Sequence, residues 1–546
     1  MKSRRSKEDT IAEQKKQSFL HGAALLAAAT AIVKVIGAFY KIPLNAIIGT
    51  KGFAYFNTAY NIYTVLLLIS TAGLPVAMSR MISAANSLGN TKQVKRIYKT
   101  AQTIFLCLGI PFGILMTCFA KPLAVFQEQP DAWAAIACLG PSAFLMCLVA
   151  AFRGFFQGHR NMMPTSVSQV LEASCKLVVG LAAAWVIKKM TSQIPLAAGG
   201  AILGVTVGCA ASAMYLFWLF RKAYKSLEEG DPTLSPDSYT KTARDLLAIA
   251  VPITIGSAGL QLITLLEIKV YMSQLLATGF TQDAADTMKG IYDMSQTIFN
   301  MPCAFIIPIT VSGIPTITAA LTVGDHAQVR ATEESASRIM ALISMPCALG
   351  LFVVARPVMA LLGGYTGAEL DLAETLMRVL SLCIVFNSFV LLTNAIMQAH
   401  GHANIPVINM FVGGAVKLGV AWLLTGNPDI AIRGVPVASV ACFLTIATLN
   451  LFSMNRCIQE PPHMIRNMAR PFLSGAIMAA CVFGVYLGLG RVFTLDSTLG
   501  KLALVGAPIL VGVVVYVVCV IKFKAITRED CLLLPKGEKI AKLLHL

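Results

Sequence analysis

About fourteen apolar stretches, each long enough to cross a lipid bilayer, follow one another along this chain of 546 residues. A helix needs roughly 20 consecutive apolar residues to cross a hydrocarbon core of about 30 Å. Inside lipid, each backbone polar group must find its partner within the protein, so such stretches fold as helices. The sequence therefore predicts an all-α, polytopic membrane protein. The expected spans are residues 19–41, 57–83, 98–120, 131–157, 163–187, 196–221, 245–274, 291–321, 333–355, 370–398, 404–425, 431–453, 467–490 and 500–522.

Composition leaves little room for a soluble domain. Apolar residues make up 56% of the chain and charged residues only 13%, against about 25% charged residues in a typical soluble domain. The longest polar stretch between spans, residues 221–244, is too short to fold alone. No phosphate-binding GxxxxGK[ST] motif, HExxH motif or GxSxG motif is present, and the 14 cysteines form no CxxC pair. We expect a secondary transporter with no enzymatic activity, resident cofactor or metal site.

The positive charge of the chain predicts its orientation. The net charge is +17, and of the 44 Lys and Arg residues 26 fall in loops on the side of both termini, 10 on the opposite side and 8 within spans. Basic loops stay in the cytoplasm, so both termini should be cytoplasmic. The basic ends of the chain fit anionic lipid at the inner leaflet. We expect membrane lipids, and no nucleic acid, as partners.

The two halves of the chain resemble each other at an offset of about 240 residues. Residues 92–126 align without gaps on residues 327–361, and Lys176 aligns with Lys417. Each half holds six spans, so the copies share one orientation and should form two bundles related by a pseudo-twofold axis along the membrane normal. The predicted plan is a basic tail (1–18), a six-helix bundle (19–221), a cytoplasmic linker (222–244), a second six-helix bundle (245–453), two additional helices (454–522) and a second basic tail (523–546).

Charged residues within the spans are the candidates for a transport site, because a charge at bilayer depth usually lines a wet cavity or has a partner. The basic ones are Lys34, Arg80, Arg153, Lys176, Lys269, Arg338, Arg378 and Lys417. Lys34, Lys176 and Lys417 lie deepest. Glu172 precedes Lys176 by one helical turn and is expected to pair with it, whereas Glu267 is expected to have no partner. Two interpretations of Glu172 and Lys176 stay open: a purely structural pair, or a group whose protonation or ion binding resets the carrier.

Three motifs carry a family resemblance. Residues 153–172 read RGFFQGHRNMMPTSVSQVLE, residues 73–79 read GLPVAMS and residues 34–37 read KVIG. They closely resemble the polysaccharide-biosynthesis branch of the multidrug/oligosaccharidyl-lipid/polysaccharide exporter superfamily, in particular MurJ and SpoVB-like proteins. The resemblance covers essentially the whole chain. It implies a MATE-like fold of six, six and two helices, in the plasma membrane of a bacterium.

The resemblance also implies a function, namely a flippase that carries lipid II, the undecaprenyl-diphosphate-linked peptidoglycan precursor, to the outer leaflet. A cationic cavity between the bundles would receive the diphosphate, and a groove beside the last two helices would take the lipid tail. Lys34 falls where the family often has an arginine of the first span, so it takes the implied phosphate-binding role. Other basic cavity residues of Gram-negative members of this family are replaced here by Tyr40, Leu68 and Thr297, so the roles of those residues are not carried over.

The predicted substrate-binding residues are Lys34, Lys41, Lys176, Lys417 and Arg153, of which Lys41, Lys176 and Lys417 are assigned by inference and not by motif. Glu172 and Glu267 are the candidates for a coupling ion, sodium or proton, and the membrane potential is a third driving force. We expect a monomer, with the cell-wall synthesis machinery as a candidate partner.

Three alternatives stay open at this stage. The first is a flippase for another lipid-linked glycan, such as a capsule, teichoic or spore-cortex precursor. The second is a cation-coupled multidrug exporter, which would be expected to have acids rather than lysines in its cavity. The third is a structural membrane protein of the division machinery with no transport cycle.

Overall fold

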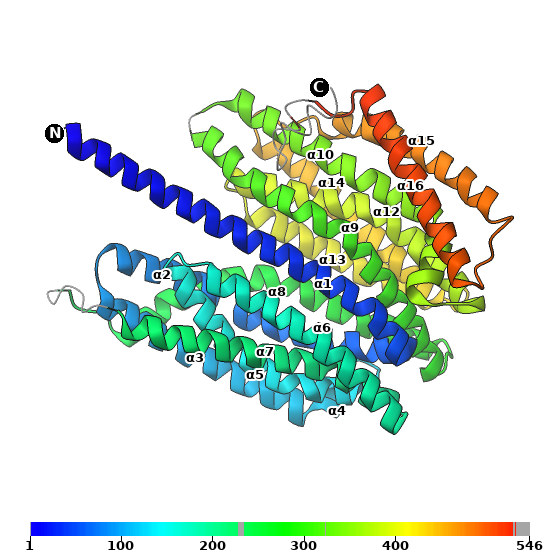
Figure 1. Cartoon of the computed structure of the whole chain (residues 1–546), viewed down its shortest axis with the longest axis horizontal. Helices are drawn as coiled ribbons and strands as arrows, with labels where there is room; N and C mark the ends of the chain where they lie inside the picture. The colour runs from blue at the N-terminus through cyan, green and yellow to red at the C-terminus, as the bar shows by residue number, and fades with distance from the viewer. Residues whose placement is uncertain (1, 228–233, 323, 528–529, 531–546) are drawn as a thin grey trace. The chain divides into compact units, whose positions relative to one another are not determined.

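The computed structural model describes residues 2–227, 234–322, 324–527 and 530, and within this part of the chain all regular secondary structure is helical (Figure 1). The first helices are α1 (Lys2–Thr71), α2 (Leu74–Ser87), α3 (Thr91–Cys118), α4 (Ala120–Phe126), α5 (Trp133–Gly158), α6 (Met163–Thr191), α7 (Ile194–Lys225) and α8 (Tyr239–Ala277). The later ones are α9 (Gln282–Thr322), α10 (His326–Val353), α11 (Ala355–Val358), α12 (Gly367–Ala399), α13 (Asn404–Thr425), α14 (Gly434–Cys457), α15 (Met464–Leu489) and α16 (Thr498–Lys522).

The prediction of an all-α polytopic membrane protein is confirmed, and each of the fourteen expected spans is largely helical, although the span at 57–83 runs across the break between α1 and α2 at residues 72–73. By length and composition, 12 helical stretches of the described chain could cross a membrane. The first of these, Val35–Ser87, covers parts of two expected spans, and α9, which carries the span expected at 291–321, is not among the twelve. Gly49, with φ 76° and ψ 172°, interrupts α1 between its two spans, in a backbone region that is essentially restricted to glycine.

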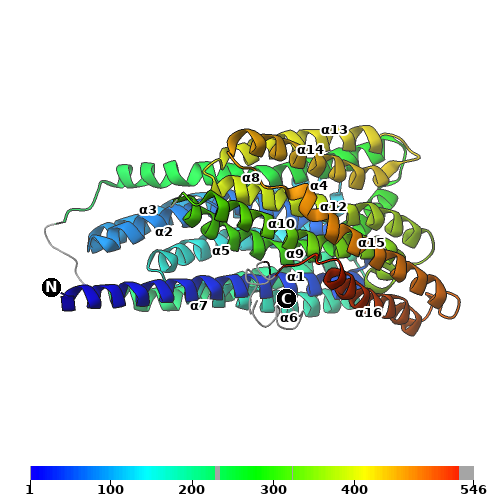
Figure 2. The same ribbon diagram turned by 90° about the horizontal axis from the view of Figure 1, so that it is seen from above.

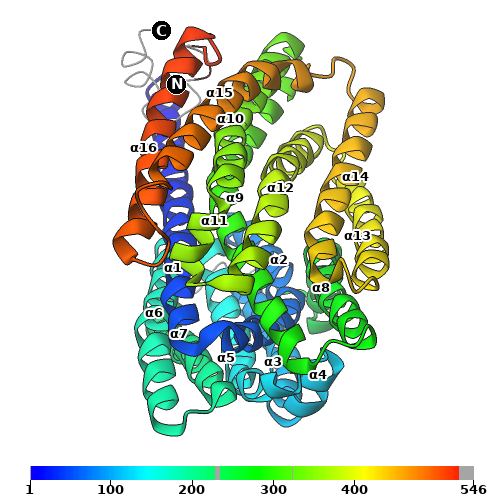
Figure 3. The same ribbon diagram turned by 90° about the vertical axis from the view of Figure 1, so that its right-hand side faces the viewer.

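The chain divides into two compact units, residues 1–265 (unit 1) and 266–546 (unit 2), and the division falls within α8. In unit 1, α5, α6 and α7 pack side by side, and α1 packs against both α6 and α7 (Figure 2). In unit 2, α12 contacts α9, α10 and α14, while α13 packs along α14 and α15 along α16 (Figure 3). Of the predicted C-terminal tail, residues 528–529 and 531–546 lie outside the described residues.

The packing of α7 on α6 depends on glycine. A Cβ atom added at Gly204 would lie 2.4 Å from the backbone nitrogen of Gly180 and 2.9 Å from the carbonyl oxygen of Lys176. At Gly208 it would lie 2.7 Å from the carbonyl oxygen of Glu172. Small residues allow membrane helices to approach closely, because helix association in lipid relies on van der Waals packing. These glycines therefore fix the backbone of α6 at the turns that carry Glu172 and Lys176.

Enlarging Gly204 should separate α6 from α7. Because overpacking a well-packed interface costs about 1–3 kcal/mol, we expect Gly204→Leu to lower the thermal stability of the detergent-solubilised protein clearly, and Gly204→Ala to lower it less. Gly419 is the control, because an added Cβ there has no neighbour within 4 Å. The measurement is a melting curve followed by size-exclusion chromatography. Equal melting temperatures for Gly204→Leu and Gly419→Leu would contradict the proposed close contact.

Candidate functional site

Lys176 lies in unit 1 against a cluster of aromatic rings. Its Nζ atom is 4.3 Å from the ring centroid of Tyr60, 5.1 Å from that of Tyr40 and 5.7 Å from that of Phe56, all three on α1. The faces of aromatic rings attract cations, and more strongly when the cation is desolvated. Lys176 forms no ion pair or hydrogen bond with any residue that the structure describes. Its ammonium is thus held by ring faces and has no acid as a partner.

The expected pair of Glu172 with Lys176 is wrong. Glu172 Oε2 instead accepts a hydrogen bond from Arg153 Nη2 at 3.2 Å, and Arg153 Nε donates to the hydroxyl of Ser168 at 2.9 Å. The planar guanidinium, which reaches across from α5, offers donors at a fixed geometry to both acceptors on α6. Arg153 and Glu172 therefore form a link between two helices.

Lys41 also lies in unit 1, where its Nζ donates a hydrogen bond to Oδ1 of Asn57 at 3.0 Å and lies 5.9 Å from the ring centroid of Phe53. Lys34 lies on α1, but its side chain falls outside the described part of the structure. Its implied phosphate-binding role stays a prediction. The other predicted residues of this half, Arg153, Glu172 and Lys176, are all described.

In unit 2, Lys417 of α13 and Glu267 of α8 form an ion pair with Nζ 2.6 Å from Oε2. The expectation that Glu267 has no partner is therefore wrong. The lysine side chain is 13% exposed and the glutamate side chain 3%. The other carboxylate oxygen, Oε1, is buried and has no hydrogen-bond partner in the described chain. Such a pair balances two charges that would each be costly to bury alone.

A second buried pair in unit 2 was not expected from the sequence. The Nζ atom of Lys289 lies 2.5 Å from Oδ2 of Asp293, one turn later on α9, and the lysine side chain is fully buried. Asp286, one turn earlier, is also buried and accepts a hydrogen bond from Gln282. The hydropathy pattern placed Lys289 in a loop before the span at 291–321, whereas α9 begins at Gln282. The spacing of Lys289 and Asp293 by four residues was the available signal.

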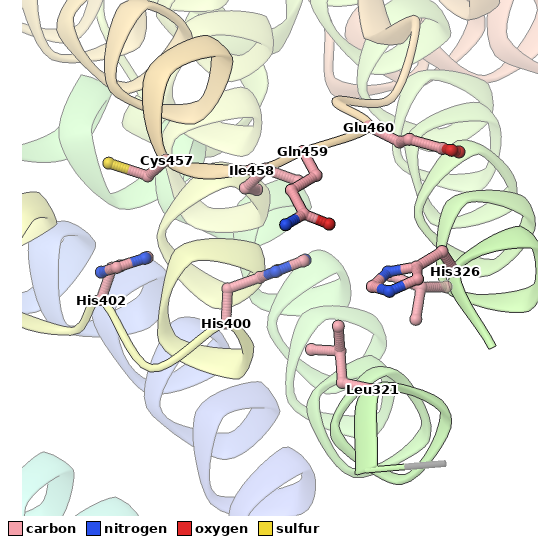
Figure 4. A pocket seen from close by; sticks show the side chains of 9 residues that line it. Leu321, His326, His400, His402, Cys457, Ile458, Gln459 and Glu460 are labelled. Carbon is pink, nitrogen blue, oxygen red and sulfur yellow. The ribbon is translucent and has the colours of Figure 1, made fainter. Parts of the chain in front are cut away.

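A separate cavity of about 300 Å³ lies in unit 2 and is lined by His326, His400, His402, Cys457 and Glu460, among others. Figure 4 shows His326 and His400 extending toward each other, with Gln459 reaching between them. Nε2 of His400 lies 2.8 Å from Oε1 of the buried Glu333. No cluster of three or more metal-ligating side chains exists among the described residues. Neither Lys417 nor Lys289 lines this cavity.

Both units thus present a half-buried lysine within a predicted span. Lysine ammonium groups bind phosphate as compact point charges, and a cation in low-dielectric surroundings attracts an anion more strongly than it does in water. In unit 1 the ammonium of Lys176 has no acidic partner in the described chain, whereas in unit 2 the ammonium of Lys417 is paired with Glu267. The arrangement can bind an anionic headgroup without a metal ligand set.

Comparison with known proteins gives matches along most of the chain. The pattern of a family described as "Polysaccharide biosynthesis protein" matches residues 19–321, and that of the MatE family matches residues 291–423. Three relatives from Bacillus subtilis (strain 168) are similar over most of their length. An uncharacterised membrane protein, YabM, is 26% identical, covering 96% of both chains.

The lipid II flippase MurJ is 24% identical over 73% of this chain and 76% of its own. Stage V sporulation protein B is 25% identical over 86% of this chain and 89% of its own.

Solved structures support the MATE-like fold. The lipid II flippase MurJ in an inward closed conformation matches with a TM-score of 0.68 at 14% identity, covering 92% of this chain and 98% of that one. An inward-facing multidrug resistance transporter of the MATE family matches with a TM-score of 0.64 at 14% identity, covering 78% of this chain and 98% of that one. The predicted fold class is confirmed. At these identities the solved structures show the fold alone.

The pairing of Glu172 can be measured by double-mutant cycles in an SDS unfolding titration of the protein in mixed micelles. Groups that share a hydrogen-bonded ion pair show coupling energies of about 0.5–3 kcal/mol. We expect Arg153→Gln and Glu172→Gln to couple within this range. The cycle of Glu172→Gln with Lys176→Met should give a smaller value, because those side chains do not bond. A larger coupling in the second cycle than in the first would contradict the observed pairing.

Proposed function

Because this chain belongs to the polysaccharide biosynthesis protein family, we propose that it is a flippase for a polyprenyl-diphosphate-linked cell-wall precursor. The substrate we propose is lipid II, the peptidoglycan precursor, moved from the inner to the outer leaflet of the plasma membrane by alternating access. Both termini would be cytoplasmic. The relatives that include a lipid II flippase support this choice, at identities near one quarter.

The observation that carries the proposal is a half-buried lysine at corresponding sequence positions of the two halves of the chain. Lys176 has no acidic partner in the described chain, and Lys417 is the more exposed member of its pair. A cationic site of this kind suits a diphosphate and not a cationic drug, which would need acidic groups for binding. The multidrug alternative is therefore disfavoured by the charge of the site. In this proposal Lys34, Lys41 and Arg153 add to the binding of the headgroup.

The direction of transport follows from electrostatics. A lipid-linked diphosphate carries roughly two negative charges, and moving each outward from an inside-negative cell is favoured by about 2.3 kcal/mol per 100 mV. Release of the headgroup from the lysines and return of the empty carrier are then the steps that need assistance. We assign this assistance to a cation or proton that binds near Glu172 or Glu267.

A second lipid-linked glycan is the alternative substrate, favoured by the similarity to stage V sporulation protein B. The same lysines would serve it, because the diphosphate is common to these carriers. A scaffold without a transport cycle would need neither lysine. Complementation separates these three possibilities.

We expect the chain to rescue a Gram-positive cell depleted of its lipid II flippase, with lipid II reaching the outer face. Lys176→Met and Lys417→Met should each reduce the rescue about tenfold or more, because each removes a charge contact that is worth at least about 1.4 kcal/mol. The measurement is the labelling of lipid II at the outer face of intact cells. Lys189→Met is the matched control, since Lys189 is an exposed lysine on the same helix as Lys176.

Failure of the inserted wild-type chain to expose lipid II would reject lipid II as the substrate. Rescue of a sporulation defect in place of growth would support the alternative glycan. Full rescue by both lysine variants would contradict the assigned binding site, and full rescue by Lys34→Ala would remove Lys34 from it.

Coupling to an ion gradient is tested separately in proteoliposomes. If Glu172 or Glu267 binds the coupling cation, its Gln variant should lose the response of the flipping rate to an imposed sodium or proton gradient, because the site loses its negative charge. Glu374→Gln is the control, since Glu374 bonds Arg356 and Arg378 elsewhere in unit 2. Both Gln variants responding to the gradient as the wild type does would exclude this role.

A further inference from the structure

The ion pair of unit 2 is unequal in its access to solvent. Lys417 is 13% exposed, whereas Glu267 is 3% exposed and only one of its carboxylate oxygens has a hydrogen-bond partner in the described chain. The lysine side chain is therefore the more accessible member of the pair. The geometry suits an exchange in which the lysine changes its partner.

A second buried group on α8 has the same unsatisfied character. Tyr271 lies one helical turn after Glu267, so the two side chains share a face of α8. Its side chain is fully buried, and its hydroxyl has no hydrogen-bond partner in the part of the chain that is described. Buried polar groups are normally satisfied, so two unsatisfied groups one turn apart need an explanation. Tyr271 thus carries a buried, unused donor one helical turn from Glu267.

The corresponding lysine of unit 1 has no such competitor. Lys176 contacts three aromatic rings, and the nearest acid on its own helix, Glu172, bonds Arg153. Aromatic rings hold an ammonium without neutralising its charge. Lys176 shows that a half-buried lysine in this fold does not need an acidic partner. The ion pair on Lys417 is therefore specific to unit 2.

We propose that Glu267 is a resident counter-anion that occupies Lys417 in the empty carrier, and that the diphosphate of the substrate displaces it. This inference rests on the proposed function. On binding, the ammonium leaves Oε2 of Glu267 and bonds the phosphate oxygens. The carboxylate stays in place and accepts a hydrogen bond from Tyr271. On release, Lys417 returns to Glu267, which restores the empty state.

This exchange makes Glu267 an inhibitor of substrate binding. Removing its charge should strengthen binding, in contrast to a structural ion pair, whose disruption would weaken the protein and the site together. Tyr271→Phe should have the opposite effect, because the carboxylate left by the lysine then has no donor to satisfy it. The two α8 variants thus move affinity in opposite directions.

The test is equilibrium binding of undecaprenyl diphosphate to the full-length protein in nanodiscs, at about pH 6 so that lysine ammonium groups stay protonated. We expect Glu267→Gln to raise the affinity about tenfold, the equivalent of about 1.4 kcal/mol. Lys417→Met and Tyr271→Phe should lower it. Glu333→Gln is the matched control, since Glu333 is a fully buried glutamate of the same unit that bonds His400. The affinity of this control variant for undecaprenyl diphosphate should stay at the wild-type value.

A charge-swapped variant, Glu267→Lys with Lys417→Glu, separates exchange from a structural role even where Glu267→Gln folds poorly. It keeps an ion pair but places the carboxylate on the accessible side, so it should fold and fail to bind the diphosphate. Wild-type affinity in this variant, or unchanged or weaker binding by folded Glu267→Gln, would overturn the exchange while leaving the proposed function intact. No binding by the wild-type protein would instead reject the proposed function.

Discussion

A charged side chain inside a membrane protein must be compensated, and the charged positions of this structure follow from that constraint. Placing a basic residue at the bilayer centre costs at least about 2.5–3.5 kcal/mol on insertion scales. Lys289 is compensated by Asp293, Lys417 by Glu267 and Arg153 by Glu172. Lys176 departs from this rule, because its ammonium contacts aromatic rings and forms no ion pair in the described structure. A position that is kept charged without an acid is the position best suited to an anionic ligand.

Close packing of α6 against glycines of α7 helps to position the charged side chains of α6. The carbonyl oxygens of Glu172 and Lys176 lie against Gly208 and Gly204 of α7, so the backbone of α6 is fixed on one side. The side chain of Lys176 then extends toward the aromatic residues of α1, while Glu172 bonds Arg153 of α5. Lipid offers no hydrophobic drive for helix association. The position of the Lys176 ammonium therefore depends on glycines of α7, which a search of the sequence for charged residues would not identify.

The sequence predicts the helices well because the bilayer imposes one rule on every span. All fourteen spans expected from hydropathy are largely helical, and the sequence repeat placed Lys176 and Lys417 at corresponding positions. Pairing was predicted poorly. Spacing by four residues suggested that Glu172 pairs with Lys176, but a guanidinium from another helix competes successfully. Glu267 and Lys417 lie 150 residues apart, so no local pattern connects them. Lys289 was missed because charged residues near the start of α9 lower the hydropathy there, so the expected span began at residue 291, after Lys289.

Lys176 contacts aromatic rings whereas Lys417 is paired with an acid, and this difference matters for a carrier that must both bind and release its substrate. A site that holds a diphosphate too tightly would stop the cycle after binding, since catalysis of transport requires release as well as capture. In the proposed exchange, a fixed carboxylate beside one lysine lowers the affinity of that lysine for the diphosphate and gives the ammonium a partner when the ligand leaves. Aromatic rings do neither, because they leave the ammonium charged and available. A duplicated fold can thus keep one lysine in each repeat and still divide capture and release between them, through the residues that surround each ammonium.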